Sequence, residues 1–170
     1  MTINNKNLLG CGIVTAIVLV MLVAVCIWLS SGKESGVHFA NEIDQYALDY
    51  IRDHQILIHG EVLIAYYDDT IQMDGTEAAI LTTKRIIYHK DGRNNAIDLS
   101  SIQDIHHKKV PLAGDIIEVY ASSGHSMKIE IAPLNGGETY RSALMRAWKN
   151  AKIGLDASEQ KTSVEDMLDR

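Results

Sequence analysis

Histidines and clustered basic side chains are the residues of this 170-residue chain that could do chemistry. Seven histidines are present, but no HExxH, GxSxG, phosphate-binding-loop or dinucleotide-binding glycine pattern occurs. His106 and His107 are adjacent, and neighbours on a strand point to opposite faces, so they cannot chelate one ion together. His89 and His107 could still approach each other across strands, but a zinc site needs several converging ligands. We therefore expect no enzyme: no catalytic residue, no cofactor and no metal site.

Basic side chains form three clusters that could contact an anionic headgroup or a protein partner. Cations close to a membrane gain about 1 kcal/mol each beside an anionic leaflet. The first cluster borders a central pair of expected strands, the second follows a later strand, and the third lies on an expected C-terminal helix. The candidates are Lys84, Arg85, Lys90 and Arg93, then Lys108 and Lys109, and finally Arg141, Lys149 and Lys152, with Arg146 beside them.

A competing interpretation is that these clusters are solvated faces of the protein. Asp91, Asp98 and Asp104 lie near them in the sequence, and the net charge of the chain is -6. A patch of charge attracts a partner only if its members gather in space. The acidic balance favours the solvated-face interpretation and argues against nucleic-acid binding.

A long uncharged segment near the N-terminus has the length of a membrane anchor for the rest of the chain. No charged residue occurs between Leu8 and Leu29, and a helix of that length rises roughly 33 Å, enough to cross the hydrocarbon core of a bilayer. We expect a transmembrane helix at 8–30 after a short tail at 1–7. A cleaved signal peptide would have a shorter apolar run, and a lipoprotein signal would not place Cys11 before that run. The expected location is a membrane, crossed once.

The flanks of this segment leave two questions open. Cys11 and Cys26 are the only cysteines and both lie in the expected span, so the remainder of the chain has no thiol and its redox compartment is undetermined. Lys6 precedes the span and Lys33 follows it, so the positive-inside comparison is nearly a tie. The side of the membrane that holds the rest of the chain stays undetermined.

A connector and an amphipathic helix are expected over 31–59. Apolar residues at Phe39, Ile43, Ala47, Tyr50 and Ile51 recur with helical spacing within 38–54. The polar face of this helix is acidic, which anionic lipid would repel. We expect the apolar stripe to pack against the domain that follows.

The segment 61–131 has the pattern of an antiparallel β domain. Short apolar runs are separated by turn residues such as Thr83-Lys84 and Asp91-Gly92. The expected strands are 61–67, 77–82, 85–90, 96–99, 102–107, 116–121 and 127–131, with a break at 111–115. About seven short strands favour a closed or nearly closed barrel over a flat sheet with two open edges.

A second amphipathic helix is expected over 138–152, where the period of the apolar residues changes. Its stripe contains Tyr140, Leu144, Ala147, Trp148 and Ala151. Gly154 is a natural stop. The remaining residues, 155–170, are polar and acidic and are expected to be a mobile tail, with a short terminal helix as the alternative.

The motif "LTTKRIIYHKDG", followed by "AIDLSSIQDI", resembles sequences of the bacterial pleckstrin-homology-like (PH-like, GRAM-like) domains. The resemblance covers roughly 60–154 and implies a mainly β (α+β) fold, a seven-stranded antiparallel barrel or roll capped by a C-terminal helix. In that superfamily the helix often contributes a tryptophan, which here would be Trp148. The loop at 68–75 lacks the lysine and arginine pairs through which lipid-binding PH domains grip inositol phosphates.

The resemblance implies a PH-like module in a bacterial inner membrane. Together with the patterns above, it predicts a non-enzymatic, membrane-anchored protein that docks or scaffolds a protein partner at the bilayer surface. The alternative is recognition of anionic lipid headgroups through the basic clusters. A third possibility, an unrecognised hydrolase, would require a pocket with converging polar groups. The partner, the pathway and the oligomeric state are left open.

Overall fold

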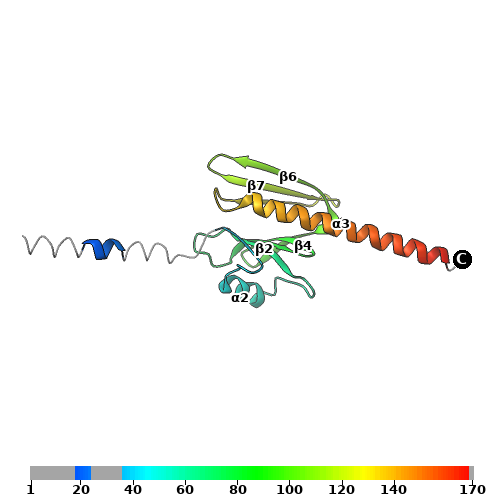
Figure 1. Ribbon diagram of the computed structural model, residues 1–170, viewed down its shortest axis with the longest axis horizontal. Coiled ribbons are helices and arrows are strands. Elements are labelled where there is room, and N and C mark those ends of the chain that lie inside the picture. Colours follow the sequence, from blue (N-terminus) through cyan, green and yellow to red (C-terminus); the bar gives the residue numbers. More distant parts are fainter. Residues whose placement is uncertain (1–17, 24–35, 169–170) are drawn as a thin grey trace, which may run out of the picture. The chain divides into compact units, whose positions relative to one another are not determined.

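A computed structural model of the chain describes residues 18–23 and 36–168 (Figure 1). The contacts divide the chain into two compact units, Met1–Glu34 and Ser35–Arg170. Residues 18–23 are helical, whereas the rest of the predicted span at 8–30, and the tail at 1–7, lie outside the described residues. Among the helices that are described, none is both long enough and apolar enough to cross a membrane.

Residues 36–168 contain eight strands, two α-helices and one 3-10 turn. In chain order these are β1 (Val37–Phe39), α2 (Gln45–Asp53), β2 (Leu63–Asp68), β3 (Glu77–Thr82), β4 (Arg85–Lys90), β5 (Arg93–Asp98), η1 (Leu99–Ser101), β6 (Ile102–Val110), β7 (Gly114–Ala121), β8 (Ser126–Ile131) and α3 (Gly137–Leu168).

The strands form two antiparallel sheets. β1 to β5 pair in sequence order as a five-stranded sheet, and β6 to β8 pair in order as a three-stranded sheet. Ile80 is opposite Ile87 in the first sheet, and Ile117 is opposite Ile129 in the second. The 3-10 turn η1 connects the two sheets between Asp98 and Ile102.

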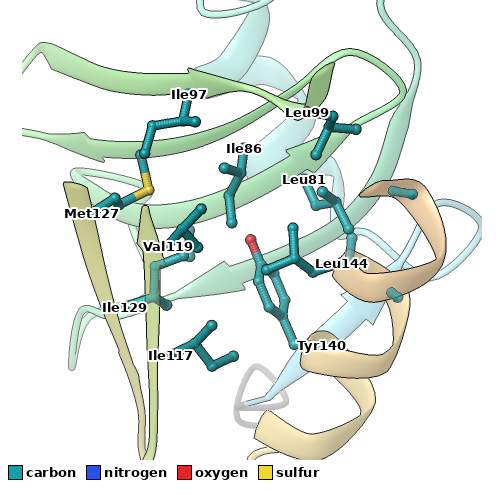
Figure 2. Close-up of a cluster of buried hydrophobic side chains, with 14 of the residues drawn as sticks. Leu81, Ile86, Ile97, Leu99, Ile117, Val119, Met127, Ile129, Tyr140 and Leu144 are labelled. Carbon is teal, nitrogen blue, oxygen red and sulfur yellow. The ribbon is translucent and has the colours of Figure 1, made fainter. Parts of the chain in front are cut away.

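The main hydrophobic core lies between the two sheets and α3 (Figure 2). Successive strand residues point to opposite faces, so alternate residues of each strand reach this core. Tyr140 and Leu144 of α3 close it and are fully buried. Each large apolar side chain buried here contributes about 1.5–3 kcal/mol. The labelled members in Figure 2 are Leu81, Ile86, Ile97, Leu99, Ile117, Val119, Met127, Ile129, Tyr140 and Leu144.

A second, smaller core lies on the other face of the five-stranded sheet. Ala47 and Ile51 of α2 pack there against Tyr66, Ile80 and Ile87. The central strand β3 is therefore covered on both faces, which is why Ala78 to Thr82 are all buried. The predicted packing of the apolar helix stripe against the β domain is confirmed.

Gly114, the first residue of β7, allows a close approach that no other residue would tolerate. Its φ is +92°, and a Cβ added there would lie 2.0 Å from the carbonyl oxygen of Ile131. Glycine adopts such a φ without a steric penalty and has no Cβ to clash. β7 can therefore begin directly against the end of β8.

The seven predicted strands all occur in the predicted order, with shifted ends. β2 begins at Leu63 rather than at 61, β5 begins at Arg93 rather than at 96, and β6 continues to Val110. The break at 111–115 is shorter than predicted because β7 already begins at Gly114. In the described part of the chain no ladder closes the predicted barrel: five strands face three across a shared core.

The ends of the predicted helices needed larger corrections. The first part of 38–54 is not helical, since Val37–Phe39 is strand β1, paired with β2. Gly154 does not stop the last helix, which runs on to Leu168. An exposed glycine costs a helix only about 1 kcal/mol relative to alanine, and nothing lies within 4 Å of a Cβ placed at Gly154. Polar composition alone did not identify 155–168 as helix.

Candidate interaction site

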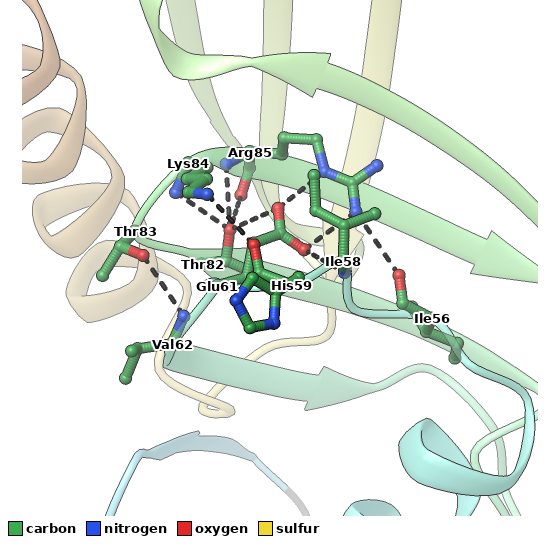
Figure 3. A network of polar contacts seen from close by, with 9 residues as sticks. All are labelled: Ile56, Ile58, His59, Glu61, Val62, Thr82, Thr83, Lys84 and Arg85. Carbon is green, nitrogen blue, oxygen red and sulfur yellow. Dashed lines mark hydrogen bonds and ion pairs between the residues drawn. The ribbon is translucent and has the colours of Figure 1, made fainter.

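Arg85, at the start of β4, is not available to an external anion because it is paired with Glu61 (Figure 3). Its Nε and Nη2 atoms donate to the two carboxylate oxygens of Glu61 at 2.6 and 2.8 Å. The Glu61 side chain is fully buried and that of Arg85 is 17% exposed. Two parallel charge-assisted bonds of this kind are strong and geometrically specific.

The environment of Glu61 keeps its carboxylate charged. Burial alone would raise the pKa of Glu61, but the hydrogen bonds from Arg85 and from the Ile58 backbone N–H outweigh it and lower the pKa below its usual value. Thr82 Oγ1 also donates to Glu61, at 3.3 Å. The predicted partner contact Arg85 therefore fastens the segment before β2 to the start of β4.

The other members of the first basic cluster have separate contacts, although Lys90 and Arg93 are opposite each other on β4 and β5. Lys84 Nζ donates to the backbone oxygen of His59 at 3.1 Å, and Lys90 Nζ lies 2.8 Å from Glu77 Oε1. Arg93 is exposed and lines a hollow of about 450 Å³ with Tyr88, Lys90, Asp91, Asn94 and Asn95. The acidic Asp91 in this hollow reduces its attraction for anions.

The loop after β2 is held by a buried carboxylate. Asp68 accepts hydrogen bonds from the hydroxyls of Tyr46 and Tyr66 at 3.1 and 3.2 Å and from the Gly75 N–H at 2.9 Å. Burial, followed by the nearby charge of Asp68, raises the pKa of both phenols. They consequently remain protonated donors, and Asp68 organises the loop through these hydrogen bonds.

The second cluster and Arg141 offer little concentrated charge. Lys108 and Lys109 are exposed on β6, and as neighbours on a strand they point to opposite faces. Arg141 Nη1 lies 2.9 Å from Glu138 Oε1, one turn away on α3. The predicted residues 84, 85, 90, 93, 108, 109 and 141 are thus not gathered into one patch.

Lys149 and Lys152 do lie together, around a hollow on α3. Its volume is about 480 Å³, and it is lined by Met145, Arg146, Trp148, Lys149, Lys152 and Ile153. We call this set the Trp148 groove. Lys152 Nζ stands 4.9 Å from the centre of the Trp148 ring, a cation–π contact.

A hydrogen bond to the start of β6 fixes the orientation of the Trp148 side chain. Its indole Nε1–H donates to the backbone oxygen of Ile102, at the start of β6, at 3.1 Å. The indole is half-buried against the main core, whereas Ile153 is 56% exposed. One face of α3 therefore presents the fixed indole of Trp148, the exposed side chain of Ile153 and three cations.

Three members of the groove were missed as site residues from sequence, since Trp148 was expected only as a residue of the core-facing stripe. Met145 and Ile153 do not stand out individually, but they fall at positions i and i+8 on the face that carries Lys149 and Lys152. Extending the predicted helix beyond 152 would have added Ile153 to this face.

The histidines separate as strand geometry requires. His106 and His107 have different partners, Asp104 Oδ2 and Asp115 Oδ1, at 2.8 and 2.7 Å. His89 lies in the other sheet, where its ring contacts Tyr50 and Asn94. His89 and His107 are therefore not brought together.

Comparisons with known proteins place these observations in a family context. Residues 58–136 match the family described as Bacterial PH domain. Solved structures that resemble the chain include a crystal structure of a DUF1696 family protein with a pleckstrin-homology domain from Shewanella loihica PV-4. That likeness has 11% identity and a TM-score of 0.48, and covers 68% of this chain and 99% of the other. No curated protein matches the chain. The segment 58–136, which contains β2 to β8 in order, is thus similar to bacterial PH domains, and the C-terminal helix α3 follows it.

Proposed function

We propose that the chain is a membrane-anchored PH-like interaction module, which docks a protein partner at the bilayer surface and catalyses no reaction. The Trp148 groove is the observation that carries the proposal. Interface cores are enriched in aromatic residues, methionine and arginine, and the groove offers all three with lysines at its rim. The segment between Leu8 and Leu29, which lacks charge, supports the anchor.

The partner expected at the groove is an acidic amphipathic segment. Apolar residues of such a segment would cover Trp148 and Ile153, and its carboxylates would meet Lys149 and Lys152. This is the helix-in-groove mode, in which spaced apolar anchors give affinity and flanking charges give register.

Recovery of partners from membranes by the full chain in detergent tests this proposal. The double variant Lys149→Glu/Lys152→Glu reverses two exposed charges without touching the core, and it should lower recovery of a specific partner about tenfold. Lys108→Glu, a charge reversal at another exposed lysine, on β6, serves as the control and should leave recovery unchanged. Equal recovery with both variants, or no partner above background, would contradict the proposal.

Recognition of anionic lipid is a second candidate, favoured by one observation. Arg146, Lys149 and Lys152 surround the groove, and no acidic residue lines it. Flotation of fragment 35–170 with neutral or anionic vesicles tests this function. Lipid recognition predicts binding that requires anionic lipid, weakens with salt, and falls about fivefold for each lysine removed. Binding that ignores lipid charge and salt would eliminate it.

A further inference from the structure

His107 lies between two carboxylates that the sequence keeps far apart. Asp115, at the start of β7, has its Oδ1 2.7 Å from His107 Nε2, and Glu138, in the first turn of α3, has its Oε2 3.7 Å from His107 Nδ1. The His107 side chain is 18% exposed. One ligand atom from each of the three residues falls within 4.8 Å of the others.

Asp115 is positioned by the fold. It is 5% exposed, and it lies against the start of α3, because a Cβ added at Gly137 would be 2.5 Å from Asp115 Oδ2. The positive end of a helix dipole favours a negative charge there. A carboxylate only accepts hydrogen bonds when ionised, so its 2.7 Å contact with His107 requires the proton on Nε2.

In the tautomer with its proton on Nε2, the Nδ1 lone pair of His107 faces Glu138. The separation of 3.7 Å from Oε2 is longer than a hydrogen bond. Two ligands that each stand about 2.1 Å from one ion, at tetrahedral to trigonal angles, are separated by roughly 3.4–3.6 Å. The separation of 3.7 Å is slightly longer than this range, so a small rotation of the Glu138 side chain would bring the two atoms to a distance at which they can share one ion.

Arg141 orients the Glu138 carboxylate so that its second oxygen lies toward His107. Its Oε1 accepts from Arg141 at 2.9 Å, which leaves Oε2 toward His107. The Glu138 side chain is 58% exposed, so water can reach the space beside it and complete a coordination sphere. Arg141 and the exposed Lys109 on the same strand as His107 are positive, and they limit the affinity for any cation.

We propose that His107 Nδ1 and Glu138 Oε2 bind a zinc-class divalent ion, with water as the remaining ligands and Asp115 orienting the imidazole through Nε2–H. Imidazole and carboxylate together suit Zn²⁺ and its analogue Co²⁺. A carboxylate on the other ring nitrogen is the usual arrangement behind a metal-bound histidine. This departs from the expectation of no metal site, because residues 107, 115 and 138 meet only in three dimensions.

Titration of the tag-free full chain in detergent with Co²⁺ tests the site, with Cys11 and Cys26 replaced by serine so that no thiolate contributes. We expect one ion per chain, detected by the cobalt visible absorption and by a shift of the His107 ring nitrogens in NMR. His107→Ala and Glu138→Gln should abolish saturable binding. Asp115→Asn should weaken it roughly 10- to 100-fold.

His106→Ala is the matched control, because His106 is the adjacent, exposed histidine with its own carboxylate, Asp104. It should change the affinity less than about twofold, since it lies on the opposite strand face. Glu138→Gln changes an exposed group and should leave the fold intact, so its result stands even if Asp115→Asn unfolds. The absence of saturable Co²⁺ or Zn²⁺ binding at pH 7.5 would overturn the proposal. Equal binding by His107→Ala and the parent would also overturn it.

Discussion

The Tyr140 hydroxyl is a buried polar group with no hydrogen-bond partner among the described residues. Figure 2 shows it directed into the main core, and burial raises the pKa of this phenol. A buried hydroxyl left without a partner costs about 1–3 kcal/mol. Tyr140→Phe removes that cost and retains the ring, so we expect the free energy of unfolding to rise by about 1 kcal/mol. Urea unfolding of fragment 35–170 measures it, and a loss of stability would indicate an unseen partner for the hydroxyl.

Glu61 and Arg85 make a different prediction at the residue scale. Replacing one partner of a buried ion pair leaves the other charge uncompensated, so Glu61→Gln should cost about 3 kcal/mol. The exposed pair Lys128 and Glu130 provides the control, and Glu130→Gln should cost less than about 1 kcal/mol. Similar values from both variants in urea unfolding at pH 7 would mean that burial does not govern the pair.

The lowered pKa of Glu61 also predicts how this stabilisation depends on pH. The folded state binds the proton less tightly than the unfolded state, whose Glu pKa is about 4.3. The stabilisation is therefore fully present above that pH and is lost as the pH falls through the lower, folded pKa. The stability difference between the parent and Glu61→Gln should accordingly shrink below about pH 4.

At the scale of elements, the β6–β7 connection depends on Gly114. Gly114→Ala combines an unfavourable φ with a contact of 2.0 Å to the Ile131 carbonyl oxygen, and we expect a loss of at least about 3 kcal/mol. Gly124, between β7 and β8, has a φ of +84° but nothing within 4 Å of an added Cβ. Gly124→Ala should therefore cost only about 1 kcal/mol. Thermal unfolding of the two variants separates backbone strain from the clash, and equal losses would contradict this assignment.

At the scale of the whole molecule, the unit Ser35–Arg170 should fold without the preceding residues. It contains both hydrophobic cores and all eight described strands. Deletion of 1–34 should leave a cooperative unfolding transition within about 1 kcal/mol of the parent, because no member of either core is removed. If the proposed anchor is correct, the same deletion moves the protein from the membrane fraction to the supernatant. Persistence of the shortened chain in the membrane fraction would contradict the anchor.

Sequence patterns determined the order and type of most elements because each depends on local spacing. Alternation in β8, the turn at Asp91-Gly92 between β4 and β5, and the helical stripe of Tyr140 and Leu144 are properties of neighbouring residues. The short strand β1 was missed because three residues carry too little pattern, and its pairing with β2 is long-range. The division into five and three strands was likewise set by packing across a shared core.

The candidate sites depended far more on tertiary structure. The sequence alone supplied a list of cations, but it could not show that Arg85 is paired with a buried Glu61 or that Lys149 and Lys152 border one groove with Trp148. It also could not bring His107, Asp115 and Glu138 together. Charge and ligand type are properties of single residues, whereas pairing, burial and convergence are distances between segments, and only the folded chain determines those distances.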